Sequence, residues 1–135
     1  MTPHDALVAT MIATSAADGT LSDEELDSIR SIISVLPVFA GFDASQVPQI
    51  ADRTFSFLDA DDGLDRLVAT IGQALPGRLN ETAYALACDV AAADGSVNIE
   101  ELRLLEILRH DLDVDRLTAA AIERGARARH ARLPN

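Results

Sequence analysis

An eleven-residue segment occurs twice in the chain, and this internal repeat limits the folds that the sequence can adopt. Residues 16–26 (Ala-Ala-Asp-Gly-Thr-Leu-Ser-Asp-Glu-Glu-Leu) return 76 residues later as residues 92–102 (Ala-Ala-Asp-Gly-Ser-Val-Asn-Ile-Glu-Glu-Leu). Seven of the eleven positions are identical in the two copies. A repeat of this kind indicates two copies of one supersecondary unit. The residues of the segment predict that this unit is a helix, a tight turn and a second helix.

Each copy carries a stop signal for one helix and a start signal for the next. In the first copy Gly19 can adopt the left-handed conformation that closes a helix. Ser22 is then an N-cap residue, and Glu25 stands at the position that completes a capping box. Leu21 and Leu26 have the spacing of a hydrophobic staple around that cap. The second copy has the equivalent residues Gly95, Asn98, Glu101, Val97 and Leu102.

The rest of the chain shows helical spacing of apolar residues, and no stretch alternates in the way that predicts a strand. Aromatic residues are 4% of the chain, so the core is expected to consist of Leu, Ile, Val and Ala. The first predicted helix runs from Pro3 to the Asp18-Gly19 stop, and the second from the Ser22 cap to Pro37. The next three cover about 45–59, 64–75 and about 78–93. The sixth begins at the Asn98 cap and the seventh at an Asp113 cap. The predicted fold class is all-α: a seven-helix bundle made of two similar helical halves. We expect a single domain over residues 1–135, with halves at about 3–75 and 78–125 and an Arg-rich tail, 124–135, that frays.

The charge of the chain limits its partners. The net charge is −11, with 22 acidic residues and 11 basic residues that are all Arg. Such a chain is repelled by nucleic acid and by anionic lipid, so the expected partners are cations and proteins with basic surfaces. No apolar run reaches the ~18 residues of a membrane span, and no signal peptide is recognisable. The expected location is therefore the cytoplasm.

The aspartates of the two repeated segments are the residues that folding explains least. Asp18 and Asp94 stand at predicted helix C-termini, where a carboxylate opposes the helix dipole. In one explanation each Asp folds back onto backbone N–H groups of its turn. In the other, the two aspartates join Glu25 and Glu101 as ligands of a hard cation, Ca²⁺ or Mg²⁺.

The cation hypothesis does not describe an EF-hand. If Asp18 is placed at the fifth position of an EF-hand loop, the first and third positions are Thr14 and Ala16, which supply no carboxylate. The second copy has Val90 and Ala92 at those positions. A weak or shared site, with Glu24 and Glu100 as additional candidates, remains compatible with the sequence.

Nothing in the sequence indicates catalysis. His4, His110 and His130 are scattered without paired spacing, and no Gly-rich phosphate loop is present. The single cysteine, Cys88, excludes an internal disulfide and a thiolate metal cluster. It lies among alanines in a predicted helix and is expected to be a small buried apolar residue. No catalytic residue and no organic cofactor are predicted.

The two Ala-Asp-Gly-x-[Leu/Val]-x-x-x-Glu corners, on a seven-helix pattern, resemble the TerB (tellurite-resistance B) family over roughly residues 3–125. The resemblance implies an all-helical fold of two similar halves and a bacterial, cytoplasmic protein linked to tellurite resistance and stress responses. It also implies metal binding by acidic residues, which fall here on Asp18, Glu25, Asp94 and Glu101. A related domain occurs beside J-domains in co-chaperones, where it serves association.

Two functions are compatible with these observations. The first is a non-enzymatic, TerB-like stress-response domain that binds a divalent cation at its acidic corners. The alternative is an acidic protein-protein interaction module that binds no metal and recruits basic partners.

Overall fold

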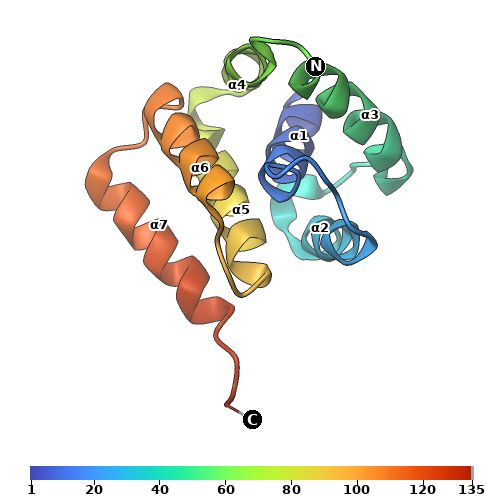
Figure 1. The fold of residues 1–135 in the computed structure, drawn as a ribbon. Coiled ribbons are helices and arrows are strands. Elements are labelled where there is room, and N and C mark those ends of the chain that lie inside the picture. Colours follow the sequence, from blue (N-terminus) through green and yellow to red (C-terminus); the bar gives the residue numbers. More distant parts are fainter. Residues whose placement is uncertain (135) are drawn as a thin grey trace.

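The computed structural model describes residues 1–134 and shows an all-α bundle (Figure 1). Short turns and three single turns of 3-10 helix join the helices. The seven α-helices are α1 (Pro3–Ser15), α2 (Asp23–Val35), α3 (Val47–Leu58), α4 (Gly63–Ala74), α5 (Asn80–Ala93), α6 (Ile99–Asp111) and α7 (Arg116–Arg129). The described residues contain no strand. The predicted all-α fold class with seven helices is confirmed.

Helix α1 lies at the centre of the bundle. It packs against α2, α3, α4, α5 and α6, and every residue from Asp5 to Ser15 is buried. A helix that is apolar on all sides is expected in such a position. Its threonines are compatible with burial because Thr10 and Thr14 donate their hydroxyl hydrogen bonds to backbone carbonyls one turn earlier, at 2.7 and 2.8 Å.

Helix α5 is the second central element, with α1 on one side and α7 on another. Helices α6 and α7 both pack on α5, and in Figure 1 they lie over it with a space between their ribbons. One hydrophobic cluster extends through the bundle from α1 to α7. No helix within residues 1–134 is long and apolar enough to cross a membrane.

The two repeated segments form the predicted turns and helix starts. Gly19 and Gly95 have φ of +97° and +80°, as the predicted stop signals require. Ser22 and Asn98 cap α2 and α6, and both capping boxes are complete. The bounds of α2 and α6 are offset by 76 residues at both ends, as the repeat predicts. Similarity of the complete halves stays a prediction.

The predicted end of the first helix was too late. Helix α1 ends at Ser15, and residues 16–19 form a separate turn in which the Gly19 N–H donates to the Ala16 carbonyl at 2.8 Å. Asp18 therefore lies in this turn, beyond the helix. Asp94, by contrast, is the C-cap residue of α5. The turn bond itself recurs in the second copy, where the Gly95 N–H donates to the Ala92 carbonyl at 3.1 Å, so the two aspartates differ in how far the preceding helix extends.

The predicted cap of the last helix was wrong. Asp115 caps α7 by accepting the Thr118 N–H at 2.9 Å, whereas Asp113 has φ of +54° and belongs to the end of α6. There the Val114 N–H donates to the Arg109 carbonyl at 3.0 Å, a bond that closes a helix through a left-handed residue.

The predicted fraying from residue 124 was also wrong, because α7 continues to Arg129. An ion pair between the Arg129 guanidinium and Asp89 on α5, at 2.6 Å, holds this end of the helix.

Candidate functional site

The fold brings the four predicted ligand residues, Asp18, Glu25, Asp94 and Glu101, into one group, which we call the acidic cluster. Two of them follow α1 and α5, and two lie in the first turns of α2 and α6. They are close enough for their charges to act on one another. Burial is the main cause that raises the pKa of Asp94 and of Glu101, and the charges of Asp18 and Glu25 raise both further. The two corners therefore share one electrostatic environment.

Glu101 is the buried member of the acidic cluster. Its residue is 3% exposed, and its Oε1 accepts the Asn98 N–H at 3.3 Å in the capping box. Its Oε2 is buried and has no hydrogen-bond partner among residues 1–134. Burial is the main cause that raises the pKa of Glu101, and the charge of Asp94 adds to it, while the Asn98 N–H lowers it. A buried carboxylate oxygen without a partner is unfavourable and calls for a donor or a cation.

The other three carboxylates are more open to solvent and each keeps at least one oxygen uncommitted. Glu25 Oε1 accepts the Ser22 N–H at 2.9 Å. Asp18 Oδ1 accepts the N–H and the hydroxyl of Thr20, both at 3.2 Å, so folding back onto the turn accounts for this aspartate in part. Asp94 accepts no hydrogen bond from the described residues, so that explanation does not extend to the second copy. Partial burial and the charges of Glu25 and Asp18 raise its pKa.

The chemistry of these residues fits a hard cation, although the site is not pre-formed. Carboxylate oxygens are the ligands that Ca²⁺ and Mg²⁺ prefer. Within residues 1–134, however, no three Asp, Glu, His or Cys side chains stand in an arrangement that could already hold a metal ion. Binding would require side-chain rotation, which the exposed positions of Asp18 and Asp94 permit. Glu24 and Glu100 are exposed neighbours.

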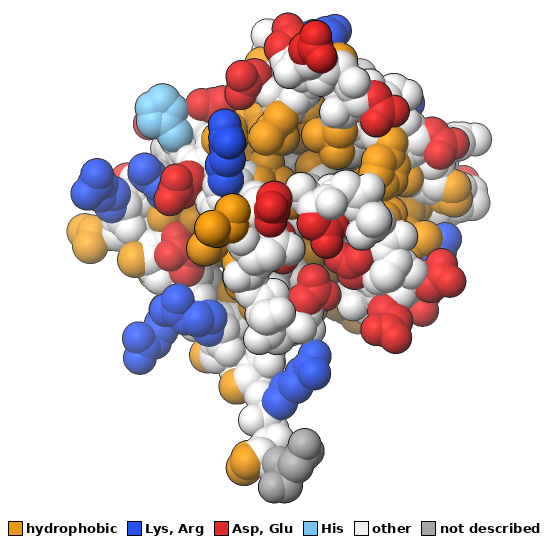
Figure 2. All heavy atoms as spheres, viewed as in Figure 1, with side chains coloured by type: hydrophobic (Ala, Val, Ile, Leu, Met, Phe, Trp, Pro, Cys, Tyr) orange, Lys and Arg blue, Asp and Glu red, His pale blue; other side chains and the backbone are white. Residues whose placement is uncertain are grey.

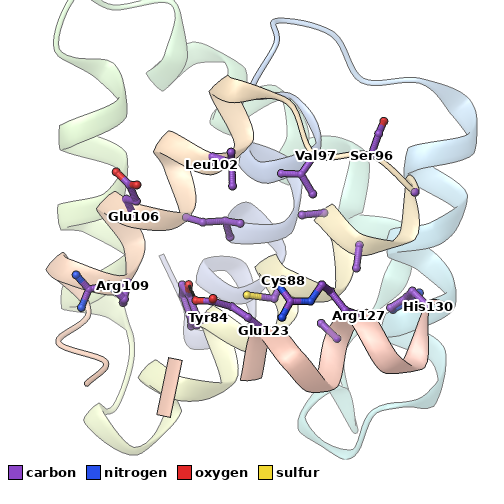
Figure 3. A pocket seen from close by; sticks show the side chains of 15 residues that line it. Tyr84, Cys88, Ser96, Val97, Leu102, Glu106, Arg109, Glu123, Arg127 and His130 are labelled. Carbon is purple, nitrogen blue, oxygen red and sulfur yellow. Dashed lines mark hydrogen bonds between the residues drawn. The ribbon is translucent and has the colours of Figure 1, made fainter. Parts of the chain in front are cut away.

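A second feature, which the sequence did not predict, is a pocket of about 530 Å³ between α6 and α7 (Figure 3). Helix α5 forms its floor. Figure 3 shows that α6 contributes Leu102, Glu106 and Arg109. On the opposite wall, α7 contributes Glu123 and Arg127, and His130 follows at its end. Apolar side chains line most of it.

The interior of this pocket contains two weakly acidic groups. The Tyr84 hydroxyl donates to Glu123 Oε2 at 2.6 Å, and this bond joins α5 to α7. Burial, with the charge of Glu123 as a second cause, raises the pKa of the Cys88 thiol to about 12. The thiol is therefore protonated and unreactive at neutral pH, which agrees with its predicted role as a small buried residue.

The pocket includes the second hydrophobic staple, which is more exposed than the first. Val97 and Leu102 are 42% and 50% exposed, whereas Leu21 and Leu26, their counterparts in the first copy, are partly buried against the core. The sequence signals for the two staples are nearly the same. The difference depends on which helices pack over them, and a repeat alone does not reveal that.

The comparisons with known proteins agree with the helical architecture. A family model described as "Tellurite resistance protein TerB" matches residues 4–124, which include α2 to α6 completely and most of α1 and α7. Searches of curated proteins and of solved structures returned no match. Because the matched region is most of the chain, this protein belongs to the TerB family.

Proposed function

We propose that this protein is a non-enzymatic, TerB-type stress-response domain that binds a divalent cation, Ca²⁺ or Mg²⁺, at the acidic cluster. The observation that carries the proposal is the buried, unpartnered Oε2 of Glu101, which belongs to a cluster with three further carboxylates. The family match supports the link to tellurite resistance and, with it, a setting in the bacterial cytoplasm.

A cation would relieve the unfavourable electrostatics of the acidic cluster. Four carboxylates at the ends of four helices repel one another, and this repulsion contributes to the raised pKa of Asp94 and Glu101. A divalent ion would replace this repulsion with attraction. Ca²⁺ suits a group that must rearrange, because it accepts six to eight oxygen ligands in flexible geometry and includes water among them.

Calorimetric titration of the chelator-treated protein with Ca²⁺, Mg²⁺ and Mn²⁺ tests the proposal. We expect binding by the wild type and its loss in the double variant Asp18→Asn/Asp94→Asn. The control Asp52→Asn/Asp61→Asn removes the same charge from exposed positions outside the cluster and should bind as the wild type does. Absence of heat and of any melting shift at millimolar ion would refute the proposal.

A second function, a protein-interaction module without metal, is favoured by the pocket between α6 and α7. Its half-exposed Val97 and Leu102 leave apolar surface beside the acidic residues of an otherwise strongly negative molecule. Figure 2 shows acidic side chains spread over much of this face, while arginines gather at its lower left, over α7. A partner segment with apolar and basic side chains would suit this combination.

Capture of partners from host lysate at low and high salt tests this second function. A partner that enters the pocket should be lost with Leu102→Gln and kept with Leu117→Gln, which changes an 85% exposed leucine that does not line the pocket. Raised salt should also release it, because part of the attraction is electrostatic. Equal retention by both variants would place the binding surface elsewhere.

A further inference from the structure

We propose that Arg132, in the segment after α7, is an internal counter-ion of the acidic cluster that competes with an added cation. The competition rests on the cation site proposed above. The docking of Arg132 onto the second corner, by contrast, rests on contacts within the chain. The two parts can therefore be tested separately.

Two observations place the Arg132 guanidinium at the second corner. Its Nη2 donates to the carbonyl oxygen of Ala93, the last residue of α5, at 3.0 Å. Its Cζ lies 4.0 Å from the point where a Cβ on Gly95 would stand. Asp94 lies between these two residues in the chain, so the guanidinium stands beside this carboxylate.

The segment reaches this position because the end of α7 is fixed to α5. The carboxylate of Asp89 accepts Arg129 Nη2 at 2.6 Å and lies 3.4 Å from Nε2 of His130. Ala93 follows Asp89 by one helical turn on α5. Arg132 thus continues along the same face of the helix on which its neighbours are anchored.

Arg132 supplies a positive charge at the C-terminal end of α5, where the helix has no basic residue of its own. The last turn of α5 contains no basic residue, so its carbonyl end and Asp94 carry uncompensated negative charge. A guanidinium there stabilises both. The last turn of α1 also lacks a basic residue, and within residues 1–134 no arginine donates to its carbonyls. The counter-ion is therefore specific to the second corner.

The negative potential of the acidic cluster attracts both a divalent ion and the guanidinium beside Asp94. Because both are positively charged, they repel each other. Docking of Arg132 must then weaken cation binding, and cation binding must weaken docking by the same factor. Because Arg132 is exposed, we expect a factor of about two to five at low ionic strength, the range of solvent-exposed ion pairs. The factor should approach one in high salt.

Two variants with equal charge separate this effect from general electrostatics. Arg132→Gln removes the counter-ion, whereas Arg124→Gln removes an exposed arginine on α7 that makes no hydrogen bond or ion pair within residues 1–134. In calorimetric titrations with Ca²⁺ at low salt, Arg132→Gln should bind about two- to fivefold more tightly than the wild type. Arg124→Gln should bind like the wild type. An equal gain in both variants, or none in either, would overturn the competition.

A metal-free measurement decides the docking itself. In ¹⁵N relaxation experiments on the chelator-treated wild type, the backbone amides of residues 131–133 should be ordered. They should become mobile in Asp94→Asn and remain ordered in the control Asp61→Asn. Unchanged relaxation in Asp94→Asn would overturn the counter-ion role. If the wild type and Arg132→Gln both fail to bind Ca²⁺, the cation function and the competition fail together, while this experiment still decides the docking.

Discussion

Glu101 and Glu25 occupy equivalent positions in the two repeated segments, yet the protein surrounds them differently. Both complete a capping box through Oε1. Glu101 is 3% exposed and its Oε2 has no partner in the described part of the chain, whereas Glu25 is only partly buried. The same residue type therefore serves as a simple cap in one corner and carries an uncompensated charge in the other.

This difference predicts opposite consequences of removing the two charges. In metal-free protein at pH 7, Glu101→Gln should raise the free energy of unfolding by about 1 kcal/mol, because it replaces a buried charged oxygen without a partner by a neutral amide nitrogen, which costs less to bury than a charge. Glu25→Gln should change it by less than about 0.5 kcal/mol, because Glu25 is only partly buried and the amide oxygen can keep the capping bond. Urea unfolding in the presence of a chelator measures both values. A clear loss of stability in Glu101→Gln would show that the charged capping bond outweighs the burial.

The glycines that end the two turns give a second prediction at the residue scale. Gly19 and Gly95 have positive φ. No atom lies within 4 Å of a Cβ placed on Gly19, and the nearest atom to one on Gly95 is Arg132 Cζ at 4.0 Å, an ordinary contact distance, so an added methyl group is opposed by backbone strain alone. Gly19→Ala and Gly95→Ala should each destabilise the protein by about 1 kcal/mol. Gly77 also has open space but no positive φ, so Gly77→Ala should be neutral or slightly stabilising. Thermal melting distinguishes the two classes; equal shifts in all three variants would contradict this explanation.

At this scale the sequence predicted what depends on local chemistry. The Ser22 and Asn98 caps and the two positive-φ glycines follow from the residue types within a few positions. The different hydrogen bonding of Asp18 and Asp94 could not be predicted, because Thr20 and Ser96 follow the two aspartates at equivalent positions, and within residues 1–134 only Thr20 donates to its aspartate. Asp113 was assigned the wrong role since two aspartates, two residues apart, are both plausible caps.

At the scale of elements, the relation of α5 to α6 and α7 distinguishes the second corner from the first. All three helices were predicted from the sequence. The pocket between α6 and α7 was not, because it depends on the distance between these two helices where both pack on α5. The Tyr84 hydroxyl on α5 donates a hydrogen bond to Glu123 on α7 at 2.6 Å, so this bond reports directly on the packing of α7 against α5.

An alkaline titration of Tyr84 tests this arrangement without labels. It is the one tyrosine in a chain without tryptophan, so ultraviolet absorbance reports this ring alone. Burial and, second, the hydrogen bond to Glu123 raise its pKa well above the ordinary value of 10.0. In the folded protein, tyrosinate should not form near pH 10, and in urea it should. Glu123→Gln should shift the onset downward. Ionisation near pH 10 in the folded wild type would contradict the packing of α5 against α7.

At the scale of the whole molecule, the carboxylates act on stability in two opposite ways. Hydrogen bonds from Ser45 lower the pKa of Asp43, and those from Thr118 lower the pKa of Asp115, so these groups stabilise the fold at higher pH and lose this effect as pH falls. Burial and neighbouring acids raise the pKa of Asp94 and Glu101 above their ordinary values of 3.8 and 4.5. Their contribution is present at low pH and is lost as pH rises through the raised values.

The metal-free protein should therefore be most stable on the acid side of neutrality, near the ordinary carboxyl pKa range. Melting temperatures between about pH 2.5 and 8, measured with a chelator, should rise to this maximum and then decline toward neutral pH, where mutual repulsion of the −11 net charge adds to the effect. In the double variant Asp94→Asn/Glu101→Gln, the melting temperature should decline much less toward neutral pH. Its rise with pH on the acid side should remain, because Asp43 and Asp115 are unchanged. Ca²⁺, if it binds the acidic cluster, should also reduce the decline, since it stabilises the ionised carboxylates. A melting temperature that rises steadily to pH 7 without metal would contradict the unfavourable charge of the cluster and, with it, the physical basis for a cation there.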